Sequence, residues 1–220
     1  MTIEPQWLIM GGAAALVGSL ALVSRAQERK RRAAYEEFCM IRGFTFEPER
    51  PDGERRFADV FDPFTAGRRR SWGYTISGTK NQAPFTVFEY RWVTGSGKNS
   101  SAHRIGGIVW ERDDAAFPKF ALSPEGWFSR LGHMFGAQDI DFPESPEFSR
   151  AYQLKGPDEP AIRRLFTPEI RRFFEATPNQ QVAAGGRFLF WFRNVRLPAA
   201  AALDEWLEQG DQVRRRLLPS

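Results

Sequence analysis

The sequence has a single cysteine and only two histidines, and this scarcity excludes several kinds of site. With Cys39 alone, no disulfide can form within the chain, which favours a reducing compartment. His103 and His133 have no second ligand-type side chain at the spacing that zinc sites use. The sequence therefore predicts no disulfide framework, no zinc site and no bound cofactor.

A complete phosphate-binding loop is also missing, although residues 94–100 read TGSGKNS. The motif G-x-x-x-x-G-K-[ST] requires a glycine five positions before Gly97, where this chain has Trp92, and the residue after the lysine is not a serine or threonine. We therefore predict no nucleotide binding. The glycines instead indicate the tip of a β-hairpin. Its polar residues form a candidate contact loop for a partner protein: Lys98, Asn99, Ser100 and Ser101.

Catalytic motifs are equally scarce, since the chain has no G-x-S-x-G nucleophile elbow. Asp139 and Asp141, two positions apart in GAQDIDFPE, would share one face of a strand. Paired carboxylates can hold a divalent cation or perform acid–base chemistry, so a metal-assisted hydrolase is an alternative function. The other interpretation is a solvated strand face with turn-capping side chains.

The charge is mildly positive, with a net value of +4 and an isoelectric point near 9.5. A dedicated nucleic-acid binder has a stronger and more one-sided charge. The basic runs at residues 68–70 and 214–216 have no stacked aromatic residues arranged beside them, so we predict no nucleic-acid binding.

Residues 7–23, WLIMGGAAALVGSLALV, contain no charged side chain. As a helix this segment would be about 25 Å long, enough for a thin or adapted hydrocarbon layer. A cleaved signal peptide is the alternative, but residues 1–6 lack the positive charge that usually begins one. We therefore predict a transmembrane helix in residues 1–24 that anchors the chain in the lipid bilayer.

A cluster of basic residues follows the predicted anchor. Positive charge stays on the cytoplasmic side of a membrane, so we expect the N-terminus outside and everything after residue 24 in the cytoplasm, at the inner membrane of a bacterial cell. The same side chains are candidates for contact with the membrane surface. They are Arg25, Arg29, Lys30, Arg31 and Arg32.

The rest of the chain predicts one α+β domain. Residues 25–43 have no glycine or proline before Gly43, which favours a juxtamembrane helix that docks through Phe38 and Ile41. Residues 44–220 form the cytoplasmic domain, in which three strand-like runs at 71–80, 84–94 and 102–112 predict an antiparallel meander. Residues 119–122 are a candidate fourth strand.

Several helices should cover this sheet. The triplets that begin at Ser123, Ser145 and Thr167 each combine a hydroxyl, a proline and a glutamate, which is a helix-start pattern. The second of them can instead be one turn before a strand at residues 152–154. Residues 187–193, RFLFWFR, indicate a buried central strand, and residues 198–218 a C-terminal amphipathic helix. No β-α-β alternation is present, so a doubly wound nucleotide fold is not expected.

Three stretches together resemble a group of uncharacterised bacterial single-pass membrane proteins: TGSGKNSSAHR, GAQDIDFPESPEFSRAYQLKG and LFTPEIRRFFE. The resemblance spans most of residues 35–217. It implies a membrane span joined to one cytoplasmic domain of unknown function, and it assigns no catalytic residue.

The sequence thus favours a membrane-anchored cytoplasmic domain that binds a partner protein or the membrane surface, without a catalytic role. Two alternatives remain open. One is the hydrolase that would use Asp139 and Asp141. The other is a sensor domain that binds a small ligand or lipid in an aromatic pocket.

Overall fold

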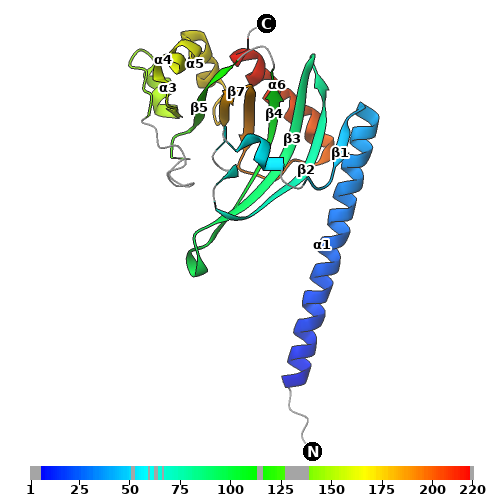
Figure 1. The fold of residues 1–220 in the computed structure, drawn as a ribbon. Helices are drawn as coiled ribbons and strands as arrows, with labels where there is room; N and C mark the ends of the chain where they lie inside the picture. Colours follow the sequence, from blue (N-terminus) through cyan, green and yellow to red (C-terminus); the bar gives the residue numbers. More distant parts are fainter. Residues whose placement is uncertain are drawn as a thin grey trace, which may run out of the picture.

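The structure is a computed structural model that describes residues 6–50, 53–58, 60–61, 64–65, 67–112, 116–126 and 139–218. Within the first helix it describes the side chains of Ser19 and of residues 22–42. The fold is α+β, with an eight-stranded antiparallel sheet and several helices, and a long first helix projects from it (Figure 1).

Helix α1 is a single helix from Gln6 to Arg42. Ala, Arg and Leu are its commonest residues, and it ends where Gly43 takes a positive φ of 68° that other residues avoid. Within the described residues, none of the helices combines the length and apolar character that a membrane crossing needs. Most side chains of residues 7–23 lie outside the described part, and the transmembrane anchor stays a prediction.

The C-terminal end of α1 docks on the sheet, but through different residues from those expected. Tyr35 and Cys39 are buried, Phe38 is partly buried, and Ile41 is 69% exposed. The expectation for Ile41 was wrong because the helix docks through positions 35, 38 and 39, and residue 41 lies outside that stripe.

The sheet has the strand order β1-β2-β3-β4-β8-β7-β5-β6. Its predicted meander is confirmed in β2, β3 and β4, and the predicted central strand is β8, between β4 and β7. The short strands β1 and β7 were not predicted. The bounds are β1 Thr45–Glu47, β2 Arg68–Lys80, β3 Ala83–Thr94, β4 Ser101–Glu111, β5 Phe117–Pro124, β6 Tyr152–Lys155, β7 Val182–Gly186 and β8 Phe188–Arg193.

The helix-start patterns behave differently from one another. Thr167 caps α5 by accepting a hydrogen bond from the Ile170 amide at 3.4 Å, and the second pattern gives a short α3 followed by β6, as predicted. The first pattern was misread, because Ser123 and Pro124 end strand β5 and pair with β6. The helices are α3 Pro146–Ala151, α4 Glu159–Leu165, α5 Pro168–Ala176 and α6 Leu203–Leu217, with short 3-10 turns at Gly53–Phe57, Gly97–Asn99 and Ala200–Ala202.

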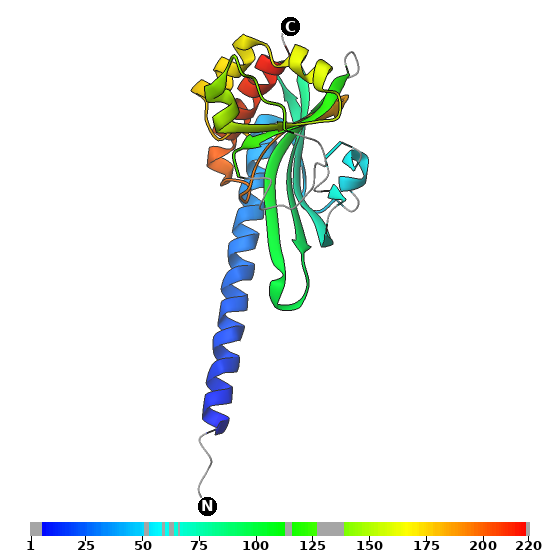
Figure 2. The ribbon, with the colours of Figure 1, turned by 90° about the vertical axis from the view of Figure 1, so that its left-hand side faces the viewer.

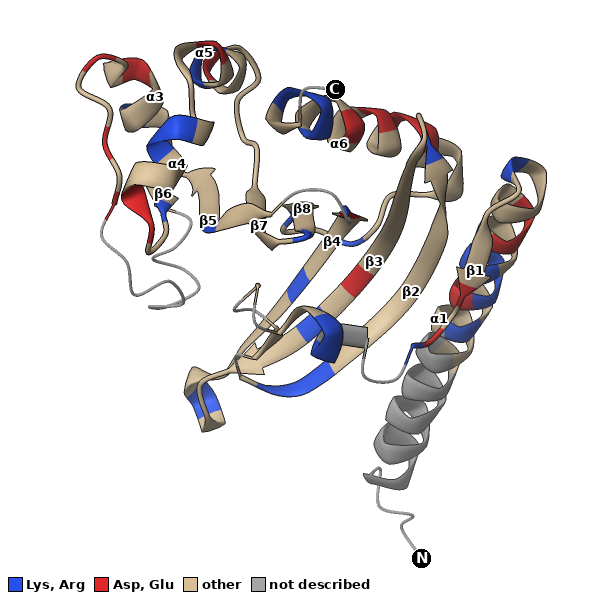
Figure 3. Cartoon of the chain, turned by 45° about the horizontal axis from the view of Figure 1, so that its top comes forward, with Lys and Arg blue, Asp and Glu red and all other residues tan. Residues whose placement is uncertain are grey.

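Apolar side chains cover both faces of the sheet. On one face, α1, α3, α4, α5 and α6 pack over a core that includes Val87, Trp110 and Trp191 (Figures 1 and 3). On the other face, Phe57, Phe61 and Phe64 pack against an aromatic layer that includes Phe88 and Phe190. The period-two pattern of β3 dictates this division, since alternate residues point to opposite faces.

Candidate functional site

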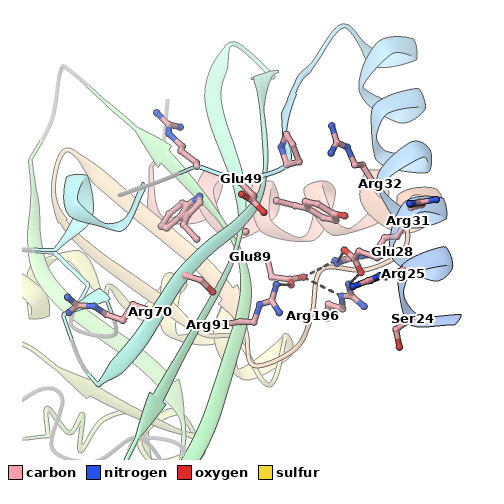
Figure 4. A pocket seen from close by; sticks show the side chains of 17 residues that line it. Ser24, Arg25, Glu28, Arg31, Arg32, Glu49, Arg70, Glu89, Arg91 and Arg196 are labelled. Carbon is pink, nitrogen blue, oxygen red and sulfur yellow. Dashed lines mark hydrogen bonds and ion pairs between the residues drawn. The ribbon is translucent and has the colours of Figure 1, made fainter. Parts of the chain in front are cut away.

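A groove of about 980 Å³ lies between the middle of α1 and strands β2 and β3 (Figure 4). Its lining contains eight arginines and only three glutamates, so its charge is strongly positive. Four of the arginines come from α1: Arg25, Arg29, Arg31 and Arg32. The other four come from the body of the protein: Arg50, Arg70, Arg91 and Arg196.

Glu89 lies at the floor of this groove and is only 2% exposed. Its Oε2 accepts a hydrogen bond from Arg31 Nη2 at 2.7 Å and one from the Leu197 amide at 3.3 Å. Arg196 and Arg91 are within 3.7 and 3.8 Å of the same carboxylate. Arg104 of β4 lies 4.0 Å from it. A buried carboxylate requires such compensation, and here it comes from cations on four separate parts of the chain.

Further contacts beside Glu89 hold α1 against the body of the protein. Tyr35 Oη donates to the Pro198 carbonyl at 2.5 Å, and Arg196 Nη2 lies 2.5 Å from Glu28 Oε2. Burial alone would raise the pKa of Glu28, but hydrogen bonds from Tyr74 and Arg196 outweigh it and lower that pKa. Burial and the bond to Glu28 raise the pKa of Tyr74 to about 12, so the phenol stays protonated and donates.

Not every cation of the groove is neutralised by an acid. Arg25 and Arg29 are exposed on α1, and among the described residues neither has an acidic partner within ion-pair distance. Arg70 donates to the Phe64 and Thr65 carbonyls, which are neutral acceptors. The groove therefore retains free positive charge that an anion can approach.

Four of the five basic residues predicted to follow the anchor line this groove. They are Arg25, Arg29, Arg31 and Arg32, whereas Lys30 is exposed on α1 and does not line it. The structure thus joins the predicted membrane-surface cluster to body residues that the sequence analysis did not select, above all Glu89, Arg91 and Arg196.

The predicted contact loop is separate from the groove. Lys98, Asn99, Ser100 and Ser101 are exposed at the tip of the β3–β4 hairpin and at the start of β4. Gly95 and Gly97 have φ values of 69° and 55°, which confirms the interpretation of this stretch as a hairpin tip.

Asp139 and Asp141 lie in a third place, next to β6. Asp139 forms an isolated bridge with Lys155, and its Oδ1 accepts a hydrogen bond from the Leu154 amide at 2.9 Å. Burial raises the pKa of Asp139, and Asp141 is exposed. In the part of the chain that the structure describes, no three histidine, cysteine or acidic side chains lie close enough together to hold a metal ion.

Only one signal in the sequence could have revealed Glu89. In PFTVFEYRWVT it is the one acidic residue among mostly apolar and aromatic neighbours, within a run predicted to be a strand of the meander. A charge at such a position requires a partner, although the pattern does not indicate which distant arginine provides it.

No family model matches the chain, and no curated protein matches it. The kinship that the three sequence stretches suggested therefore stays a prediction. A solved structure does share its fold. The chain is similar to the crystal structure of the mycobacterial trehalose monomycolate transport factor A, TtfA, with a TM-score of 0.61 at 14% identity over 87% of this chain and 97% of that one.

Proposed function

We propose that this chain is a non-catalytic, membrane-tethered domain whose arginine-lined groove binds the anionic headgroups of the membrane surface. The observation behind the proposal is the position of the groove. Its lining begins at Ser24 and continues along α1 through Arg32, immediately after the predicted span at residues 7–23. A headgroup at the end of that span reaches the groove without leaving the bilayer.

The charge of the groove favours a phosphate-bearing lipid. Each Lys or Arg near an anionic membrane surface contributes about 1 kcal/mol of binding free energy. Arg25 and Arg29 face this surface without an acidic partner among the described residues, whereas Glu89 and Glu28 occupy Arg31 and Arg196. Arginine also recognises phosphate oxygens with two parallel hydrogen bonds.

The membrane topology that we propose follows from the same basic residues. The N-terminus lies outside and the folded domain lies in the cytoplasm at the inner membrane, because Arg25, Arg29 and Lys30 follow the span directly. The shared fold with a protein described as a transport factor is compatible with a binding role that needs no chemistry. A partner protein is the other occupant to be tested.

Native mass spectrometry of the detergent-purified full chain tests the proposal. Dioctanoyl phosphatidylglycerol should bind more tightly than dioctanoyl phosphatidylcholine, and glycerol 3-phosphate distinguishes a lipid ligand from a free phosphate ester. The double variant R25Q/R29Q should weaken phosphatidylglycerol binding by about ten-fold or more, since two cations are lost. The matched control R150Q/R172Q removes the same charge from α3 and α5, outside the groove, and should bind like the parent chain.

A variant expected to strengthen binding distinguishes an effect on the site from a general loss of folding, because unfolding can only weaken binding. Glu49 lines the groove and is exposed, so E49Q removes a negative charge and should strengthen phosphatidylglycerol binding. Equal affinity for the two lipids, or no response to R25Q/R29Q, would rule out the lipid assignment. Tight binding of glycerol 3-phosphate alone would assign the groove to a soluble phosphate compound.

A further inference from the structure

The β3–β4 hairpin extends beyond the body of the protein on the side from which the N-terminal half of α1 also projects. Both views show it pointing in the same direction as that half of the helix (Figures 1 and 2). We propose that this hairpin end is a second contact with the anionic membrane surface, separate from the groove. The inference rests on the membrane tether proposed above, since the tether gives the direction of the bilayer.

The chemistry of the tip suits a layer of headgroups. Residues 95–100 are all exposed, and TGSGKNSS at 94–101 contains no apolar side chain that would enter the hydrocarbon. The loop is compact, because the Ser96 and Gly97 carbonyls accept hydrogen bonds from the Asn99 and Ser100 amides. Lys98 is therefore presented on a short, ordered turn.

The charge around the tip has one sign. No acidic residue occurs between Asp62 and Glu89, or between Glu89 and Glu111, so the hairpin end of β2, β3 and β4 is free of carboxylates. Arg68 pairs in register with Val93 of the hairpin, and Arg68 and Arg69 are exposed beside it. Figure 3 shows basic segments on the hairpin and at the adjoining end of β2, and a mixture of acidic and basic segments on the helices of the other end.

The occupant that fits best is a surface of anionic lipid. The exposed cations Lys98, Arg68 and Arg69 would each add about 1 kcal/mol at such a surface, too little to bind alone and enough to orient a domain that α1 already holds there. Contacts at both α1 and the hairpin resist tilting of the domain relative to the bilayer. The groove then stays directed at the bilayer.

Fluorescence quenching on the full chain in nanodiscs tests this contact. A fluorophore on S96C reports the tip and leaves Lys98 intact, and a fluorophore on E147C in α3 reports the far end. The native Cys39 needs no replacement, because it is 2% exposed and burial raises the pKa of its thiol to about 11, so it should not label. The unsubstituted chain is the labelling blank.

With a headgroup-attached quencher in phosphatidylglycerol-containing nanodiscs, the S96C label should be quenched several-fold more than the E147C label. Adding R68Q/R69Q/K98Q, or replacing the lipid with pure phosphatidylcholine, should reduce that difference. Quenching no stronger at the tip than at α3 overturns the proposal, as does quenching that ignores lipid charge. A cross-link from position 96 to a protein, without quenching, assigns the tip to a protein partner and overturns it too.

The two proposals fail independently. If R25Q/R29Q still abolishes the lipid preference while the tip is not quenched, only the hairpin contact is wrong. If the tip is quenched while the groove shows no lipid preference, only the groove assignment is wrong.

Discussion

At the scale of single residues, Glu89 connects several separate parts of this structure. It is nearly inaccessible, and the cations around it come from α1, from its own strand, from β4 and from the segment before α6. Arg31 depends on it in turn, since that guanidinium is 15% exposed and the bond to Glu89 raises its pKa against the effect of burial. Neither partner would be stable there alone.

Replacing Glu89 with glutamine should therefore destabilise the protein by about 3 kcal/mol, because the mostly buried Arg31 loses its closest counterion and keeps only Glu28, 3.6 Å away. Thermal unfolding of the detergent-solubilised chain, followed by its tryptophan fluorescence, measures the loss. The exposed pair of Glu147 and Arg150 provides the control, and E147Q should change stability by less than about 0.5 kcal/mol. An E89Q variant as stable as the parent would show that the acid is not a required counterion.

At the scale of elements, the close approach of α6 to the sheet depends on a glycine. Gly210 lies within α6, where glycine is unfavourable for the helix itself. A methyl group at this position would come within 2.7 Å of Ile108 Cδ1, 2.8 Å of Trp110 Cη2 and 3.0 Å of Trp191 Cε3. The glycine is thus required by packing against β4 and β8.

Gly210→Ala should consequently lower stability by about 1–3 kcal/mol, although alanine improves helix propensity by about 1 kcal/mol. The unfolding temperature would fall by about 2–4 °C for each kcal/mol in a chain of this size. Gln209→Ala, on the exposed side of the same turn, is the matched comparison and should leave it nearly unchanged. A higher unfolding temperature for G210A would mean that α6 lies farther from the sheet than described.

At the scale of the whole molecule, the distribution of charge gives the protein two distinct ends. The hairpin end and the middle of α1 are basic, whereas the helices α3 to α6 at the far end carry acidic residues and arginines together (Figure 3). Such a molecule approaches an anionic surface with its basic end first. Salt should weaken this preference, since exposed charges are screened within about 10 Å at 0.1 M ionic strength.

The proposed topology makes a prediction at this scale. Alkaline phosphatase, which requires an oxidising compartment, should be inactive when fused after Ser220 and active when fused before Met1. A fluorescent protein that matures in the cytoplasm should give the converse result. Phosphatase activity at the C-terminal fusion would reverse the orientation and remove the cytoplasmic assignment.

Local patterns predicted much of the fold. The strand-like pattern in residues 84–94 predicted strand β3, whose alternate side chains enter two cores, Phe85 and Val87 in one and Phe88 and Tyr90 in the other. The cap at Thr167 predicted α5 for the same reason: each signal lies within a few residues of the element it specifies. By contrast, Ser123-Pro124-Glu125 contains the same local signal, yet pairing with β6 overrides it.

The candidate site was less accessible to sequence reasoning because its residues come from distant parts of the chain. Arg31 and Glu89 are 58 positions apart, and Glu28 and Arg196 are 168 apart. Sequence patterns report on neighbours along the chain, so the cluster of positive charge after residues 7–23 identified the arginines of α1, and the body residues opposite them were missed. The depth of the groove results from tertiary packing alone.

The composition of helix α1 also affects how the domain is positioned. The helix contains no glycine or proline from Ser19 to Arg42. This part of the helix therefore has no residue that favours a kink between Ser19 and the turns where Arg31 bonds Glu89 and Tyr35 bonds the Pro198 carbonyl. Each residue of a helix adds about 1.5 Å of height and about 100° of rotation. The number of residues between Arg25 and Tyr35 therefore determines how far the domain lies from the start of α1 and which way it faces about the helix axis. Rotation of the N-terminal end of α1 turns the whole domain with it.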